Sequence, residues 1–289
     1  MTEPTSGAAP ARRPPATLLV VAAVFSVQFG NALAGAYFER LGPLGAAALR
    51  LALGAAILAL AVRPRVRGWT LRTWIGALVL GAGLGGMNAL IYLAIDEIPI
   101  GIAVTVELLG PLAVAAAGIR RPLDVAWVLL AVGGVALLGF DPGKALSLPG
   151  LLLAAGAAAF WAMYIVASSR LGPRVRGVDG LAVAMIVAAL VVVPFGAGHA
   201  VAAVGADPWL LVVFAGVALL TSALPYALEF TALKTMSSRV FGVLSSLGPA
   251  VAALAGLIVL QQSLSTAQVV ALALVTAASA GVIATSRRV

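Results

Sequence analysis

The sequence predicts an all-α integral membrane protein with ten transmembrane helices, built as two inverted five-helix repeats with both termini in the cytoplasm. The hydropathy, the distribution of positive charge and an internal repeat lead to this prediction. The 289-residue chain is 62% hydrophobic and 10% charged, with a mean hydropathy of +1.12. A soluble domain could not present such a composition to water. The apolar runs are continuous, whereas a transmembrane β-barrel would show alternating segments of roughly 10 residues.

A helix that crosses a membrane needs about 20 mainly apolar residues. Stretches of this kind predict spans at 17–36, 43–62, 72–94, 99–119, 124–140, 149–170, 180–198, 208–232, 239–260 and 266–285. The connections are too short to hold a soluble catalytic domain. Residues 1–16 are polar and rich in Pro and Ala, which predicts a disordered cytoplasmic tail. Residues 286–289 form a second cytoplasmic tail.

The start of the chain has some features of a cleaved signal peptide. Arg12 and Arg13 precede an apolar run that contains Ala32-Leu33-Ala34. However, the run is longer than the apolar region of a typical signal peptide, and its removal would leave nine spans. A retained first helix is therefore the favoured interpretation.

Positive charge alternates along the chain. Fifteen of the eighteen basic residues fall in every second gap between apolar stretches: Arg12, Arg13, Arg63, Arg65, Arg67, Arg72, Arg120, Arg121, Arg170, Arg174, Arg176, Lys234, Arg239, Arg287 and Arg288. The intervening gaps hold only Arg40 and Lys144. Basic loops are retained in the cytoplasm, so the pattern predicts a bacterial inner-membrane protein with both termini inside. The net charge of +8 then faces anionic lipid, and nucleic-acid binding is not expected.

The chain also repeats itself once. Gly110-Pro111 aligns with Gly248-Pro249 at an offset of 138 residues, and the segment that starts at Asn88 then aligns with the one that starts at Tyr226. The repeats cover 17–140 and 149–285. Because each contains five helices, the second must enter the membrane in the opposite direction. Inverted repeats are typical of secondary transporters, whose substrate site lies near the membrane midplane.

Three ionisable residues fall within the predicted spans: Arg50, Glu107 and Glu229. A charge at the membrane centre costs about 2.5–3.5 kcal/mol, so such a residue normally faces a cavity or a partner. Glu107 lies mid-span before Gly110-Pro111, a pair that loosens the helix. A carboxyl in this position could carry a proton, or it could pack a helix through a hydrogen bond. Arg50 could hold a substrate carboxylate in a bidentate fork, or it could pair permanently with Glu107.

Glu229 follows Tyr226 by three residues, which places both on one helix face. Lys234 and Arg239 are near enough in sequence to hold Glu229 in a structural ion pair instead.

Two further pairs of polar or aromatic side chains share a helix face. Asn88 and Tyr92 lie on the third span, and Trp161 and Tyr164 lie on the sixth. Amide and phenol groups suit the recognition of a zwitterionic or hydroxylated small molecule. Four glycines on the third span allow neighbouring helices to approach closely: Gly81, Gly83, Gly85 and Gly86.

Catalysis finds little support in the sequence. The chain has no cysteine, and His199 is its only histidine, expected at the edge of the seventh span. Neither a metal-binding cluster nor a nucleophile motif is present, so no cofactor is expected. A membrane-embedded enzyme remains the alternative class, which a transport assay in liposomes would distinguish.

Several segments resemble the drug/metabolite transporter superfamily, within its ten-helix EamA-type branch, and most closely the inner-membrane threonine/homoserine exporters. They are Ala48–Gly54, Gly85–Ala94, Ile98–Val114, Arg120–Asp124, Trp161–Ile165 and Ala223–Leu233. The resemblance implies efflux of small amino acids driven by the proton gradient. It matches Arg50, Asn88, Tyr92, Glu107, Tyr226 and Glu229 to motif positions of the family.

The sequence departs from the family at two carboxyl positions. Relatives commonly have Glu-Pro where this chain has Gly248-Pro249, and Gly-Glu where it has Gln261-Gln262. A mechanism that relies on those carboxyls is therefore in doubt, which leaves Glu107 as the candidate proton site.

We therefore expect a proton-coupled amino-acid exporter. Glu107 would carry the proton, and the expected substrate contacts are Arg50, Asn88, Tyr92, Trp161, Tyr164, Tyr226 and Glu229. The alternative is an exporter of another amphipathic metabolite or drug, for which a more aromatic and less charged cavity would be expected.

Overall fold

The computed structural model describes residues 15–117, 122–138, 147–245, 247–262 and 265–286, and this part of the chain is helical without strands. The helices are α1 Ala16–Gly35, α2 Phe38–Val62, α3 Leu71–Glu97, α4 Ile100–Glu107, α5 Leu109–Ala116, α6 Pro122–Leu138, α7 Leu148–Leu171, α8 Asp179–Ala206, α9 Trp209–Ala218, α10 Leu224–Leu233, α11 Ser238–Ser245, α12 Gly248–Val259 and α13 Thr266–Ser286. The predicted tails, apart from Pro15, Ala16 and Ser286, lie outside the described residues. So do Arg120, Arg121 and Lys144.

Six helical segments are long and apolar enough to cross a membrane: Ala16–Gly35, Phe38–Val62, Leu71–Glu97, Leu148–Arg174, Asp179–Ala206 and Trp209–Leu233. Shorter apolar helices lie at the other four predicted spans. The chain is thus a multi-pass membrane protein, and its division into ten crossings in two repeats stays a prediction. Large apolar side chains face outward, as lipid contact requires. Leu60, Leu190 and Phe195 are 74%, 69% and 71% exposed.

Two of the predicted spans are broken helices, and a proline explains each break. The predicted span 99–119 divides after Glu107, and 239–260 divides after Ser245. Proline has no N–H group, and its ring clashes with the carbonyl group four residues earlier. For Pro111 that residue is Glu107, and for Pro249 it is Ser245. The two Gly-Pro pairs thus end a helix directly after a polar residue in both halves of the chain.

Other spans are less regular or longer than the sequence predicts. The predicted span 208–232 contains a π-helical turn at Leu219–Ala223, between α9 and α10. Ser26 on α1 donates a hydrogen bond to the Leu220 carbonyl in that turn. Helix α8 continues past Pro194 to Ala206, so His199 lies within a helix rather than at its edge.

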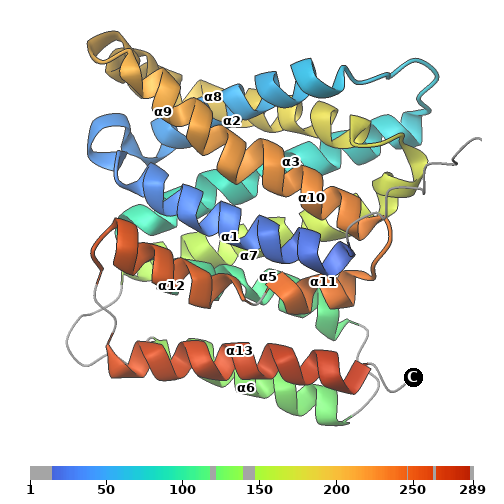
Figure 1. The fold of residues 1–289 in the computed structure, drawn as a ribbon, viewed down its shortest axis with the longest axis vertical. Helices are drawn as coiled ribbons and strands as arrows, with labels where there is room; N and C mark the ends of the chain where they lie inside the picture. The colour runs from blue at the N-terminus through green and yellow to red at the C-terminus, as the bar shows by residue number, and fades with distance from the viewer. Residues whose placement is uncertain (1–14, 118–121, 139–146, 246, 263–264, 287–289) are drawn as a thin grey trace, which may run out of the picture.

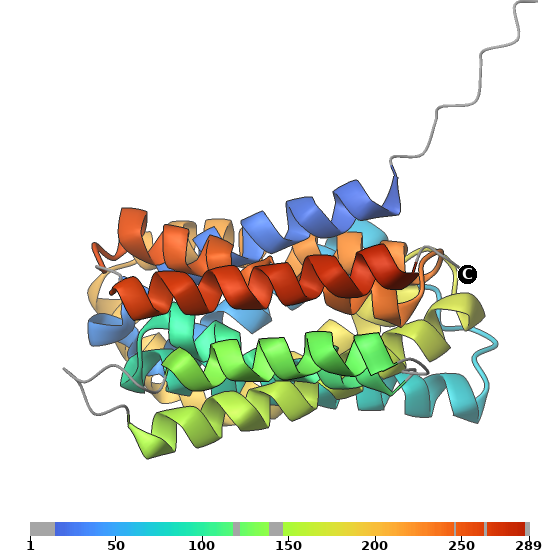
Figure 2. The same ribbon diagram turned by 90° about the horizontal axis from the view of Figure 1, so that it is seen from below.

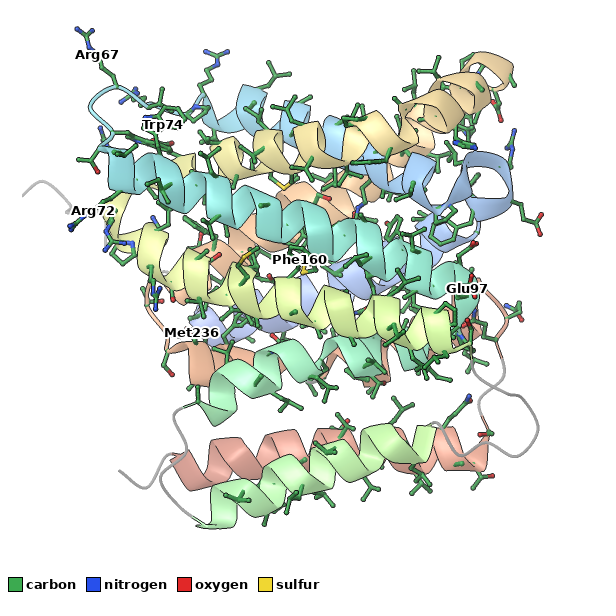
Figure 3. All side chains as sticks on the ribbon, turned by 180° about the vertical axis from the view of Figure 1, so that it is seen from behind. Arg67, Arg72, Trp74, Glu97, Phe160 and Met236 are labelled. Carbon is green, nitrogen blue, oxygen red and sulfur yellow. The ribbon has the colours of Figure 1, made fainter. Side chains whose placement is uncertain are left out.

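Helix α3 packs closely between α7 and α8 through its glycines. A Cβ atom on Gly81 would lie 2.6 Å from the Ala184 carbonyl oxygen of α8, and one on Gly86 would lie 2.7 Å from the Phe160 ring of α7. Figure 3 shows Phe160 at the crossing of α3 and α7. The predicted close approach of helices at this glycine cluster is confirmed. It brings the middle of α3 to the centre of the molecule.

The remaining packing joins helices from the two halves of the chain. Helix α2 packs on α8, and α1 packs on α10 and α12. Helices α6 and α13 lie side by side at one edge of the bundle (Figures 1 and 2). Arg67, in the loop before α3, and Arg72, in the first turn of α3, lie at one end of the molecule, and Glu97 lies at the other (Figure 3).

Candidate functional site

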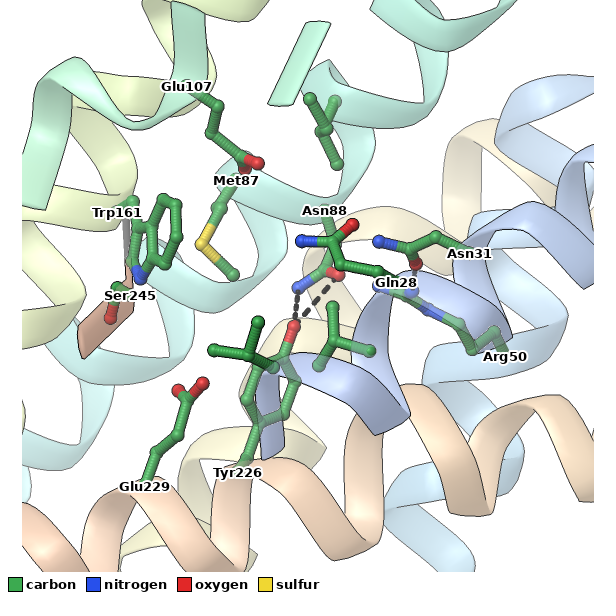
Figure 4. Close-up of a pocket in the computed structure, with 13 residues that line it drawn as sticks. Gln28, Asn31, Arg50, Met87, Asn88, Glu107, Trp161, Tyr226, Glu229 and Ser245 are labelled. Carbon is green, nitrogen blue, oxygen red and sulfur yellow. Dashed lines mark hydrogen bonds between the residues drawn. The ribbon is translucent and has the colours of Figure 1, made fainter. Parts of the chain in front are cut away.

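A small polar cavity lies at the centre of the bundle, where α3 and the two broken helices meet α1, α2, α7 and α10 (Figure 4). Its volume is about 40 Å³, enough for a few water molecules. The lining residues are Val24, Val27, Gln28, Asn31, Arg50, Met87, Asn88, Ile91, Glu107, Trp161, Tyr226, Glu229 and Ser245. The cavity thus combines one cation, two carboxyl groups and several neutral polar groups.

Arg50 is held rigidly at one side of the cavity. Its side chain is 1% exposed, and Nη1 donates hydrogen bonds to Asn31 Oδ1 at 2.7 Å and to Tyr92 Oη at 2.8 Å. The guanidinium carbon also lies 4.4 Å from the centre of the Tyr92 ring, a cation–π contact. Nε and Nη2 have no hydrogen-bond partner among the described residues. These two nitrogens form an edge of the guanidinium that can donate two parallel hydrogen bonds to one carboxylate.

Glu107 lies across the cavity from Arg50, at the end of α4 (Figure 4). The residue is 7% exposed. Within the described part of the chain its carboxyl group makes no hydrogen bond or ion pair, and the one ion pair recorded there joins Arg40 to Asp207 at 2.8 Å. The structure therefore brings Arg50 and Glu107 to one cavity without pairing them.

Glu229 is the second carboxyl group of the cavity and is 5% exposed. Tyr164 Oη donates a hydrogen bond to Glu229 Oε2 at 3.1 Å. Lys234, considered above as an ionic partner, instead donates hydrogen bonds to the carbonyl groups of Val175 and Gly177. The side chain of Arg239 lies outside the described residues.

Asn88 and Tyr226 form a hydrogen-bonded pair in the middle of the cavity (Figure 4). Asn88 Nδ2 and Tyr226 Oη are 2.9 Å apart, and Tyr226 Oη and Asn88 Oδ1 are 3.0 Å apart. A second bond from Asn88 Nδ2 to the Leu84 carbonyl, at 2.7 Å, fixes the amide. These two residues occupy equivalent positions in the predicted repeats.

The structure places the eight predicted site residues together, but not all of them face the cavity. Six line it: Arg50, Asn88, Glu107, Trp161, Tyr226 and Glu229. Tyr92 and Tyr164 lie one layer behind, each with its hydroxyl group bonded to a charged side chain of the cavity. Their position suits them to orient Arg50 and Glu229 rather than to touch a substrate.

Sequence reasoning missed three polar lining residues: Gln28, Asn31 and Ser245. Gln28 and Asn31 are three apart on one face of the first span, and both are 5% exposed. Buried amides on one face of an apolar helix are a signal that a search restricted to ionisable residues overlooks. Ser245 follows from the repeat, because the offset that aligns the Gly-Pro pairs also aligns it with Glu107.

The side chains that line this cavity can form hydrogen bonds and ion pairs with a small polar molecule. Among the described residues there is no group of three His, Cys, Asp or Glu side chains that could hold a metal ion. A free guanidinium edge and two carboxyl groups complement a small molecule that carries both a negative and a positive charge.

Comparison with known proteins relates the chain to a family of transporters. The model of the EamA-like transporter family matches residues 148–284. The threonine/homoserine exporter RhtA of Salmonella typhimurium (strain LT2) is 43% identical over 281 residues, 94% of this chain and 92% of the relative. RhtA of Escherichia coli K12 is 42% identical with the same coverage. A solved crystal structure matches with a TM-score of 0.68 and 25% identity over 94% of this chain and 98% of its own.

These relatives are named exporters rather than enzymes, and their similarity extends over nearly the whole chain. Together with the apolar helices and the buried polar cavity, it shows that the chain belongs to the EamA-like transporter family.

Proposed function

We propose that this protein exports small amino acids of the threonine and homoserine type across a bacterial inner membrane, in exchange for protons. The observation that carries the proposal is the buried Arg50 with two unbonded guanidinium nitrogens, in a cavity that also holds two carboxyl groups. The names of the relatives, threonine/homoserine exporters, support the same substrate class.

The substrate carboxylate would bind to Nε and Nη2 of Arg50. Asn31 and Tyr92 already hold Nη1, so the guanidinium is oriented before the substrate arrives. Such preorganisation reduces the entropy that binding costs. A buried nitrogen without a partner also carries a desolvation penalty, which a bound carboxylate would relieve.

The substrate ammonium group would bind to Glu229. Tyr164 occupies Oε2 of this carboxylate, which leaves Oε1 for the ammonium. Gln28 Oε1, which has no hydrogen-bond partner among the described residues, and Ser245 are available to the substrate hydroxyl, and Asn88 joins them once its bonds to Tyr226 open. Threonine and homoserine differ in where that hydroxyl lies, and several acceptors around one cavity suit both.

Glu107 would carry the exchanged proton. Glu229 is bonded to Tyr164, whereas the Glu107 carboxyl has no hydrogen bond or ion pair among the described residues and faces the same cavity. A carboxyl group that exchanges its proton with substrate binding couples the two gradients, and proton relay is one recognised use of acidic residues at membrane depth.

The cavity of about 40 Å³ lies among buried side chains, and we infer that the substrate enters it through a different arrangement of the helices. Alternating access provides it: one repeat rocks against the other around the fixed site. The Asn88–Tyr226 pair joins α3 to α10 across the predicted repeat boundary. We infer that this pair opens when the substrate binds.

The experiment is transport of labelled threonine and homoserine by purified protein in liposomes. Counterflow, in which unlabelled substrate inside drives uptake of the label, tests the substrate class without a proton gradient. Uptake driven by an imposed proton gradient tests coupling. Failure to move any amino acid in counterflow would overturn the proposed substrate class.

Replacing Glu107 tests the coupling step. We expect Glu107→Gln to keep counterflow and to lose accumulation driven by the proton gradient, because the amide cannot bind and release a proton. Asp96→Asn makes the same chemical change at an exposed residue outside the cavity and should accumulate like the wild type. Proton-driven accumulation that survives in Glu107→Gln would remove the assigned role.

Export of another amphipathic metabolite or drug is the alternative within the family. Trp161 and Tyr226 are the only aromatic residues among those that line the cavity, which holds three ionisable ones. This charged lining favours an amino acid. Counterflow with hydrophobic cations in place of threonine would separate the two substrate classes.

A further inference from the structure

A second concave site, which shares no lining residue with the polar cavity, lies on the outer surface where α3 begins and α7 ends. Its volume is about 510 Å³, and it is lined by Arg72, Ile75, Gly76, Val79, Ala162, Met163, Val166, Ala167, Arg170, Leu171 and Arg174. We call it the arginine groove. Three arginines at one end and apolar residues along the rest make it amphipathic. We propose that the arginine groove binds one anionic phospholipid, with the phosphate on the arginines and an acyl chain on the apolar floor.

The arginines provide uncompensated positive charge. Arg72 is the second residue of α3, while Arg170 and Arg174 come from the end of α7 and the 3₁₀ turn that follows. Arg174 Nη1 donates a hydrogen bond to the Arg170 carbonyl at 2.5 Å, which holds the Arg174 side chain near the helix end. No acidic residue lines the groove, and none of these arginines forms an ion pair within the described part of the chain. A phosphate group complements such a cluster through charge-assisted hydrogen bonds.

The floor of the groove explains why a lipid is favoured over a free phosphate. Ile75 and Val79 are 50% and 39% exposed, on a helix apolar enough to span the membrane. Gly76 lets α3 and α7 approach closely at the floor of the groove, because a Cβ atom there would lie 3.2 Å from Leu171 Cδ1. From Arg72 to Val79 the helix rises about 10 Å, which matches a headgroup and the first part of an acyl chain.

Retention of positive loops in the cytoplasm does not by itself require this arrangement. Arg63, Arg65 and Arg67 lie in the exposed loop before α3, carry the same total charge and line no part of the groove. They can satisfy the topological requirement without any concave apolar surface. Basic pockets between transmembrane helices are a recognised form of headgroup site. The loop arginines therefore supply a matched control.

The test measures lipid binding to the purified full-length protein in detergent by native mass spectrometry and by thermal denaturation. The probes are phosphatidylglycerol, phosphatidylcholine with the same acyl chains, and soluble glycerol phosphate. We expect the wild type to retain phosphatidylglycerol selectively and to denature at a higher temperature in its presence. Each arginine near an anionic group contributes about 1 kcal/mol, so changing all three to glutamine should weaken phosphatidylglycerol binding roughly a hundredfold.

Two further variants keep the result decisive. The variant with Arg63, Arg65 and Arg67 changed to glutamine should bind phosphatidylglycerol like the wild type. Ala162→Phe keeps every arginine but fills the apolar floor, and it should also lose the lipid. The proposal is overturned if phosphatidylcholine binds equally well, if both triple variants lose the lipid equally, or if glycerol phosphate gives the full thermal shift. The last outcome would identify a free-phosphate site.

Discussion

At the scale of single residues, the cavity divides into groups that would touch the substrate and groups that hold them. Arg50 faces the cavity, and Asn31 and Tyr92 fix one of its three nitrogens. Glu229 faces the cavity, and Tyr164 fixes one of its oxygens. Glu107 has no such support. A side chain held by hydrogen bonds suits substrate recognition. A carboxyl group without a hydrogen bond or ion pair suits the binding and release of a proton.

The unbonded edge of the Arg50 guanidinium, formed by Nε and Nη2, gives a specific prediction. Arg50→Lys keeps the charge but loses the planar pair of donors, so we expect KM for threonine counterflow to rise about tenfold or more. Arg63→Lys makes the same change in an exposed loop and should leave KM unchanged. An Arg50→Lys variant with the KM of the wild type would show that the carboxylate does not bind to the guanidinium edge.

Sequence reasoning found the charged residues of the site because charge at membrane depth is costly and therefore conspicuous. It did not find that Tyr92 and Tyr164 lie behind the cavity rather than in it. Helix periodicity gives the face on which a residue lies, but not its depth in the packing. That depth is set by neighbouring helices, here by the Phe38 ring, whose centre is 5.2 Å from that of Tyr92.

At the scale of elements, the glycines of α3 and the two proline breaks position the site. The glycines let α3 approach α7 and α8, which carries Asn88 to the centre of the bundle. The breaks after Glu107 and Ser245 end two helices at the cavity wall. The sequence predicts the close approach at the glycines and the loosened helix after Glu107 as local effects, but not the break after Ser245. The sequence does not predict the π-helical turn at Leu219–Ala223, in which the Leu220 carbonyl accepts a hydrogen bond from Ser26 of α1.

The close packing of α3 is testable with one methyl group. A Cβ atom on Gly81 would lie 2.5 Å from Val187 Cβ, so Gly81→Ala should destabilise the protein by about 1–3 kcal/mol. Gly216→Ala adds the same methyl on α9, where nothing lies within 4 Å, and should be neutral or slightly stabilising. Thermal denaturation in detergent compares them. Equal midpoints for both variants would contradict the packing described for α3.

At the scale of the whole molecule, hydropathy predicts the helices and their insertion in the membrane. The basic residues of the loops predict the orientation. The helices and their apolar outer surface agree with that prediction. Only the structure shows which segments far apart in the chain lie close together. Asn88 and Tyr226 align in the sequence, but alignment does not imply that their side chains form a hydrogen bond.

The predicted orientation can be measured because the chain has no cysteine and thus no background labelling. We expect a cysteine at Arg67 to be protected from a membrane-impermeant thiol reagent in intact cells. A cysteine at Ala206, an exposed residue at the end of α8, should be labelled. The reverse pattern would place the basic loops outside and contradict the positive-inside interpretation.

The most direct test of the account is an experimental structure of the protein with threonine bound. We predict the substrate carboxylate within hydrogen-bond distance of Arg50 Nε and Nη2, its ammonium group at Glu229, and the Asn88–Tyr226 pair separated around an enlarged cavity. Threonine bound elsewhere, with Arg50 bonded only to Asn31 and Tyr92, would contradict the central claim that this cavity is the transport site.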